Sequence, residues 1–186
     1  MKRTYRATLL ARLGIVGAIY ACSIASTVEA TAQFTDQIVI EGGSEQLFTE
    51  PLEPALHADP ELRYKLMMRI PGNGCSASWR GYVAGWEIRT DELYLVDVQV
   101  DPCSSVKKMV PLAELFPGAS GPVKADWFSG TLTVPQGQLI EYVHMGYGSR
   151  YEHYLLLNID KGNVTSSTLT SGPPAEYQRL QSKPRE

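Results

Sequence analysis

Residues 78–102 read SWRGYVAGWEIRTDELYLVDVQVDP, and this stretch decides the fold. It contains two runs of alternating residues on either side of a polar turn at 90–92. The apolar face of the first run consists of Tyr82, Ala84, Trp86 and Ile88. The corresponding face of the second run consists of Tyr94, Val96, Val98 and Val100. Because side chains alternate between the two faces of a strand, the pattern predicts an antiparallel hairpin with one mainly apolar face.

Two glycines mark the first strand of this hairpin. Gly81 and Gly85 lie four residues apart and therefore on the same face of the strand. A residue without a side chain permits a β-bulge, sharp curvature or the close approach of a large neighbour. Strands curved in this way are typical of a small barrel or a strongly twisted sandwich.

Similar period-two patterns occupy most of the chain outside the hairpin. We expect further strands at 37–40, 64–70, 127–134, 138–145, 151–159 and 163–170. For 64–70, a helix that begins at Pro60 is the alternative, because Leu62 and Leu66 have helical spacing. Turns are expected at 71–74, 135–137 and 160–163, where Gly, Pro and Asn cluster. The predicted fold class is mostly β, an antiparallel twisted sandwich or small barrel.

One short helix is expected within this β-rich fold, after the hairpin. Pro111 suits the first turn of a helix, and the Pro-Gly pair at 117–118 ends it. The residues that would share its apolar face are Leu112, Leu115 and Phe116.

The N-terminal residues have the three-part pattern of a secretory signal peptide. Four basic residues precede an uncharged run at 13–25, and Ala30-Thr31-Ala32 provides a cleavage site. The run is shorter than the ~20 residues that span a bilayer. We therefore expect a signal peptide at 1–32, a single β-rich domain at 33–169 and a flexible tail at 170–186. The alternative is a lipid anchor on Cys22, which follows a sequence similar to a bacterial lipobox.

Removal of the leader makes the chain clearly acidic. The full chain has 17 basic and 20 acidic residues, and the leader contains four of the basic residues and one acidic residue. The remaining 13 basic and 19 acidic residues leave a net charge of −6. Nucleic acids and anionic membranes attract basic surfaces, so neither is an expected partner. Membrane contact is expected only if Cys22 is lipidated.

The processed chain contains two cysteines, Cys75 and Cys103. In an oxidising compartment two such cysteines pair, and we expect a disulfide between them. In the chain-entropy description a bridge across this separation contributes about 3 to 3.5 kcal/mol. Two cysteines this far apart do not make a zinc site.

The three tryptophans, Trp79, Trp86 and Trp127, lie within or beside predicted strands. A carbohydrate-binding platform would need them exposed and coplanar. We expect them instead in the core or on a face of the sheet.

The residues most typical of a site lie in EYVHMGYGSRYEHY at 141–154, which connects two predicted strands. We expect Tyr142, His144, Tyr147 and His153 on one side of a shallow surface site, with Arg80 as a further binding residue. Tyrosine and histidine combine apolar area with hydrogen-bonding tips, as binding surfaces favour. Two histidines are too few for a metal site, and no cofactor or catalytic residue is assigned. Acid–base catalysis by the two histidines is the alternative.

Two blocks of this sequence, WRGY…WEI near Trp79 and YVHMGYGS at 142–149, carry a resemblance. Over residues 78–165 the chain resembles an uncharacterised bacterial family. The resemblance implies a bacterial source and no particular activity. Together these observations favour an exported protein, periplasmic or secreted, that binds a protein or envelope component without catalysis. An immunity or inhibitor role is one form of this hypothesis, and an envelope hydrolase that uses the region of His144 and His153 is the alternative.

Overall fold

The computed structural model describes residues 32–72, 75–144 and 146–174. The expected leader therefore lies outside the described residues except for Ala32, and so does the expected tail from residue 175. Within the described ranges, strands dominate and the helices are short. In chain order the elements are β1 (Asp36–Ile40), β2 (Gly43–Leu47), α1 (Glu53–Ala58), α2 (Pro60–Met67), β3 (Tyr82–Arg89), β4 (Glu92–Val100), β5 (Lys108–Met109), α3 (Leu112–Leu115), β6 (Val123–Lys124), β7 (Gly130–Glu141), β8 (Arg150–Asp160) and β9 (Asn163–Ser171).

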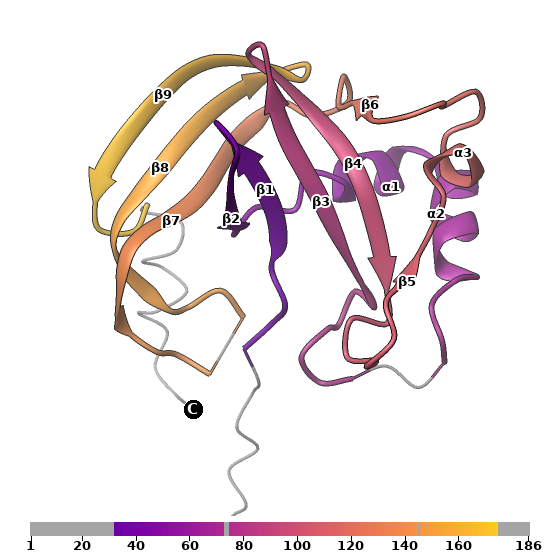
Figure 1. Cartoon of the computed structure of the whole chain (residues 1–186), viewed down its shortest axis with the longest axis horizontal. Helices are drawn as coiled ribbons and strands as arrows, with labels where there is room; N and C mark the ends of the chain where they lie inside the picture. The colour runs from indigo at the N-terminus through magenta and orange to yellow at the C-terminus, as the bar shows by residue number, and fades with distance from the viewer. Residues whose placement is uncertain (1–31, 73–74, 145, 175–186) are drawn as a thin grey trace, which may run out of the picture.

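All nine described strands belong to one sheet, in the order β2-β1-β3-β4-β9-β8-β7, with β5 and β6 both paired to β4 (Figure 1). Neighbouring strands are antiparallel apart from β1 and β3, which run parallel. Strands β4 and β9 share a single residue pair, Glu92 with Asn163, so the sheet bends sharply there into two halves. Buried residues of both halves, such as Trp86 and Leu132, belong to one core.

The two edge strands of the sheet approach each other without forming a ladder. Just beyond β2, the Phe48 backbone N donates to the carbonyl of Thr133 in β7 over 2.9 Å. Thr49 adds two bonds, because its Oγ1 accepts from Thr133 N and donates to the carbonyl of Thr131. The sheet is thus strongly curled but not closed. The mostly β fold class is confirmed, with three short helices where one was expected.

The central hairpin forms as predicted, with one correction in β4. In β3, Tyr82, Ala84 and Trp86 are buried. In β4, a bulge between the pairs Gly85–Asp97 and Trp86–Leu95 leaves Val96 as an extra residue. Because one extra residue reverses the alternation, the buried face changes along the strand. The buried residues of β4 are therefore Leu93, Leu95, Val98 and Val100.

The expected strand at 64–70 is wrong, because the chain forms helix α2 there. Asp59 caps this helix: its Oδ1 accepts from the backbone N of Glu61 at 2.9 Å and of Leu62 at 3.1 Å. Pro60 occupies the first turn, where its missing N–H costs nothing. Leu62 and Leu66 then bury one side of the helix. No helix in the described ranges is long and apolar enough to cross a membrane.

The expected turn at 135–137 is also wrong, because β7 continues through it. The ladder with β8 includes the pairs Pro135–Tyr154 and Gln136–His153, and it resumes at Leu139 after a register shift. Gly137 adopts a φ of 78° in the shifted segment. Proline is tolerated in an edge strand, where no neighbour needs its N–H. The predicted turn at 160–163 is confirmed between β8 and β9.

Candidate ligand-binding groove

An open groove of about 340 Å³ lies between the first described residues, the β1–β2 hairpin and the loop that joins β7 to β8. Leu139 at the end of β7 forms part of its wall, beside the open edge of the sheet. Much of the lining is aromatic, with the rings of Phe34, Phe48, Tyr142, Tyr147 and Tyr151. The polar lining consists of side-chain amides and hydroxyls, contributed by Gln33, Thr35, Gln37, Gln46 and Ser149.

Asp36 is the centre of a buried polar network behind this groove. Its carboxylate is fully buried in β1. Oδ1 accepts from Arg80 Nη2 at 2.9 Å and from the backbone N of Ala84 at 3.0 Å, and Oδ2 accepts from Trp86 Nε1 at 3.0 Å. The parallel pairing of β1 with β3 brings these partners together. Three donors compensate the carboxylate for the loss of water.

Arg80 connects Asp36 to the wall of the groove. Its Nη2 donates to Tyr147 Oη at 3.3 Å, and its Nε lies 3.3 Å from Glu50 Oε1. Its guanidinium carbon lies 4.7 Å from the centre of the Tyr82 ring. Nη1 is buried and has no hydrogen-bond partner among the described residues. The sequence predicted Arg80 as a binding residue, but the structure places it behind the lining, where it positions Tyr147.

Burial and charge shift the pKa values within this network. Burial raises the pKa of the Asp36 carboxyl, although Arg80 opposes the rise. Burial lowers the pKa of the Arg80 guanidinium, but the combined attraction to Asp36, the two tyrosine hydroxyls and Glu50 outweighs that effect, and the pKa lies above its usual range. Burial also raises the pKa of the Tyr147 and Tyr82 hydroxyls above the ordinary value of 10.0. Both hydroxyls donate hydrogen bonds, Tyr82 to Glu53 and Tyr147 to Glu50.

Tyr147 is anchored at both ends of its side chain. Its hydroxyl donates to Glu50 Oε1 at 2.7 Å, and its ring stacks on Phe48 with centroids 5.5 Å apart. Phe48 also meets the edge of Tyr151 at 5.9 Å. Tyr147 is thus a half-buried part of the groove wall rather than an exposed tip. We expect its truncation to destabilise the fold as well as to alter the groove.

The other predicted site residues lie in different places. Tyr142 lines the groove with 54% of its surface exposed, and the exposed His144 meets its ring edge-on at 4.6 Å. His153 is exposed in β8, where its ladder partners are Gln136 and Ser171. The β7–β8 ladder ends at Glu141 with Arg150, so His144 has no ladder partner. Within the described chain no hydrogen bond, ion pair or ring contact joins His144 to His153, and no cluster of three metal-ligand side chains is present.

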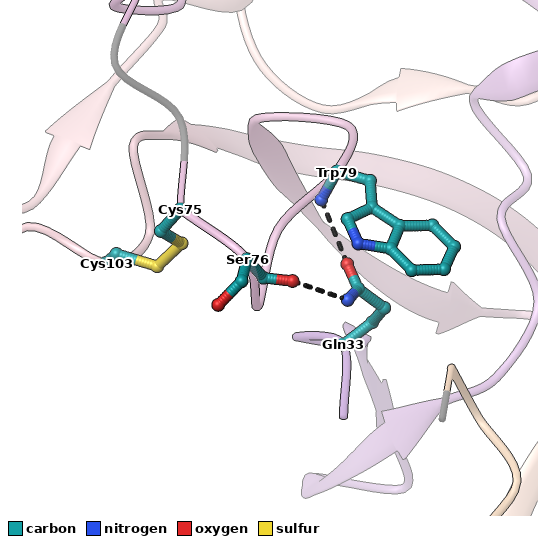
Figure 2. Close-up of a disulfide and its surroundings, with 5 residues drawn as sticks. All are labelled: Gln33, Cys75, Ser76, Trp79 and Cys103. Atoms are coloured by element: carbon teal, nitrogen blue, oxygen red, sulfur yellow. Dashed lines mark hydrogen bonds between the residues drawn. A yellow bond between two sulfur atoms is a disulfide. The ribbon is translucent and has the colours of Figure 1, made fainter. Parts of the chain in front are cut away.

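The loop that follows the Cys75–Cys103 disulfide binds Gln33, which is one of the first described residues (Figure 2). Cys75 and Cys103 are bonded as predicted, with their Cα atoms 6.4 Å apart. The Gln33 amide is bound at both ends, because Nε2 donates to the carbonyl of Ser76 at 2.8 Å and Oε1 accepts from Trp79 N at 2.9 Å. The Gln33 backbone N donates to the carbonyl of Gly146, which ties the segment to the β7–β8 loop.

The tryptophans follow the expectation in part. Trp86 is fully buried in the core. Trp127 is half-buried, stacks on Phe116 with centroids 5.2 Å apart and donates to the carbonyl of Pro51. Trp79 is 72% exposed, contrary to the expectation, and stands beside Gln33 (Figure 2).

Several residues of the groove carried no signal in the sequence. Asp36 lies just before a predicted strand, and its partner Arg80 is 44 residues away. Gln37 and Gln46 look like ordinary surface residues of a strand. Phe34 and Phe48 were not assigned to any element. A signal of the right kind existed only at 141–154, where aromatic residues are dense.

Comparison of the chain with protein-family models, with curated proteins and with solved structures finds no match. The candidate site therefore rests on its own geometry.

Proposed function

We propose that this chain is an exported bacterial protein that binds a protein or envelope component in the aromatic groove, without catalysis. One observation carries the proposal: five aromatic rings line one open groove. Concave, mostly apolar sites with a few placed polar groups are typical of ligand binding. Two of the rings, Tyr142 and Phe34, are about half exposed and thus free to contact a ligand.

The construction of the groove supports binding rather than turnover. Its wall is fixed in advance, because Tyr147 is anchored to Glu50 and Arg80 and stacks on Phe48. A fixed wall reduces the entropy that binding would otherwise cost. His144 and His153, the residues of the alternative hydrolase hypothesis, share no contact in the described chain. An inhibitor or immunity role is one form of the binding proposal.

Export is supported by the leader pattern at 1–32 and by the bonded pair Cys75–Cys103, since disulfides persist in oxidising compartments. We expect the exported chain to begin at Gln33. Intact-mass measurement of the exported protein tests this. The mass of a chain that begins with a lipidated Cys22 would contradict it and would mean that the protein is anchored to a membrane.

Substitution at the groove tests the binding proposal. Tyr142→Ala removes an exposed ring of the lining, whereas Leu169→Ala removes an equally exposed side chain in β9, which does not line the groove. Each protein is immobilised and exposed to a solubilised bacterial envelope fraction, and the retained material is compared. The wild type and Leu169→Ala should retain the same component, and Tyr142→Ala should lose it. Identical retention by all three proteins, or no retention by any, would refute the proposal.

A further inference from the structure

The chemistry of the lining narrows the class of ligand. We propose that the groove binds a neutral oligosaccharide, an inference that rests on the proposed binding function. Three features of the groove support it: the absence of charged side chains from its lining, the exposed area of two of its aromatic rings, and a pair of side-chain amides with unused hydrogen-bonding atoms.

The first feature is charge. Among the described residues, none that lines the groove is an Asp, Glu, Lys, Arg or His. Behind the Tyr147 hydroxyl, Asp36 and Glu50 are each paired with Arg80. A negatively charged ligand would find no cationic side chain in the lining, and the amino group that cleavage after Ala32 leaves at Gln33 already has the Gly146 carbonyl as its partner. The lining suits a ligand that is polar and uncharged.

The second feature is the exposed aromatic area. Tyr142 is 54% exposed and Phe34 is 45% exposed, and both line the groove. The face of an aromatic ring is partly negative, and a pyranose presents a flat face of C–H groups that are partly positive. Stacking of a sugar on such a ring uses the apolar face of the sugar and leaves its hydroxyls at the rim, free to form hydrogen bonds.

The third feature is the pair Gln37 and Gln46, which lie directly opposite each other in the β1–β2 ladder. Residues opposite each other in a ladder project from the same face. Gln37 Nε2 donates to Thr35 Oγ1 and to the carbonyl of Asp36. Gln46 Oε1 accepts from the Tyr151 hydroxyl at 3.5 Å. Within the described ranges, Gln37 Oε1 and Gln46 Nε2 have no protein partner. One acceptor and one donor remain, which together match hydroxyl groups, since a hydroxyl both donates and accepts.

The shape of the groove fits a chain rather than a single sugar. Its volume of about 340 Å³ is at the small end of ligand sites, and it is open. A bound oligosaccharide can therefore place one or two units over the rings and extend beyond them. An extended uncharged peptide is the competing occupant, and the experiment includes it.

The test uses the purified protein and isothermal titration calorimetry. The probes are four neutral tetrasaccharides (of N-acetylglucosamine, cello-, malto- and manno-type), tetragalacturonate as the anionic counterpart, and an uncharged octapeptide library. The variants are Tyr142→Ala, Gln46→Leu and the control Leu169→Ala, and each is first shown to be folded by circular dichroism. At least one neutral tetrasaccharide should bind, and tetragalacturonate should bind more weakly by about tenfold or more.

The variants decide whether that binding belongs to the groove. Tyr142→Ala and Gln46→Leu should each weaken it by about tenfold, and Leu169→Ala should leave it unchanged. The inference is overturned if no neutral tetrasaccharide binds, if tetragalacturonate binds as tightly, or if both groove variants bind like the wild type. Peptide binding that Tyr142→Ala abolishes, without sugar binding, would overturn the oligosaccharide and keep the proposed function. Failure of every probe together with failure of the envelope retention experiment would overturn both.

Discussion

Arg80 is the residue on which the groove depends most, although it does not line the groove. It neutralises Asp36 in the core and, through the hydroxyl of Tyr147, connects that buried pair to the wall. The favourable attraction within such a pair is offset by the cost of taking two ions out of water. Removal of one partner is costly, because the other ion then remains buried without compensation.

We therefore expect Arg80→Met to lower the free energy of unfolding by about 3 to 5 kcal/mol. Arg69→Met is the matched control, since Arg69 pairs with Glu114 on the surface, where both side chains are largely exposed. That control should change stability by no more than about 1 kcal/mol. Urea denaturation of the two variants measures the difference. Equal, small effects would mean that the Asp36–Arg80 pair does not organise the fold.

Elements far apart in the chain meet in the groove, and the Cys75–Cys103 bond secures one of these meetings. The loop after Cys75 binds both ends of the Gln33 side-chain amide. In the same loop, the carbonyl of Ala77 accepts a hydrogen bond from the Phe34 backbone N at 2.8 Å. The bond thus acts beyond its own loop: it stabilises the segment that forms one side of the groove (Figure 2).

Replacement of both cysteines by serine should lower the free energy of unfolding by about 3 kcal/mol. It should also loosen the segment locally. Hydrogen exchange at the Phe34 amide should accelerate more than exchange in the β8–β9 ladder, which the bond does not touch. Uniform acceleration across both regions would show that the bond stabilises only the domain as a whole.

Local sequence patterns predict some of the secondary-structure elements and not others. The β3–β4 hairpin, the turn at 160–163 and the helix at 112–115 were predictable, because alternation and turn residues are local signals. The bulge at Val96 was not located, since an extra residue leaves the composition of the strand unchanged. The pattern at 64–70 favours a strand over the helix that forms, because Tyr64, Leu66 and Met68 also alternate. Its cap at Asp59 was the signal that distinguishes the two, because Asp before Pro marks a helix start.

For the groove, the sequence contains a signal for only one of the two walls. Two residues of the aromatic stretch at 141–154, Tyr142 and Tyr147, line the groove, and their role in binding stays a prediction. The opposite wall comes from 32–48, where the sequence resembles an ordinary first strand and its turn. Which residues of that wall face the loop is decided by the curl of the whole sheet, and long-range geometry of this kind has no local signature.

At the scale of the whole molecule, buried tyrosine hydroxyls make the stability of the fold depend on pH in the alkaline range. Burial raises the pKa of Tyr82 and Tyr147 above 10.0. A group whose pKa is higher in the folded state stabilises that state fully below its unfolded pKa, and this contribution is lost as the pH rises through the folded value. The fold should therefore lose stability progressively above a pH of about 10.

Phenolate absorbance during an alkaline titration tests this expectation. In urea, all the tyrosines should ionise together near their ordinary pKa. In the folded protein, part of the amplitude should be delayed and should appear together with the loss of circular dichroism. Tyr147→Phe should reduce the delayed part. Identical titration curves for the folded and unfolded protein would contradict the buried phenols.

The central claim is that the ligand binds in the groove between the β1–β2 hairpin and the β7–β8 loop. A second hollow of about 410 Å³, lined by Tyr64, Met68 and the Arg69–Glu114 pair between α2 and α3, offers a direct comparison. The most direct measurement is the mapping of backbone amide shifts in ¹⁵N-labelled protein during titration with each of the four neutral tetrasaccharides. The account predicts that the largest shifts, for at least one of them, occur at Gln37, Gln46 and Gly146. Shifts gathered around Tyr64 and Met68, or no shifts with any of the four, would contradict it.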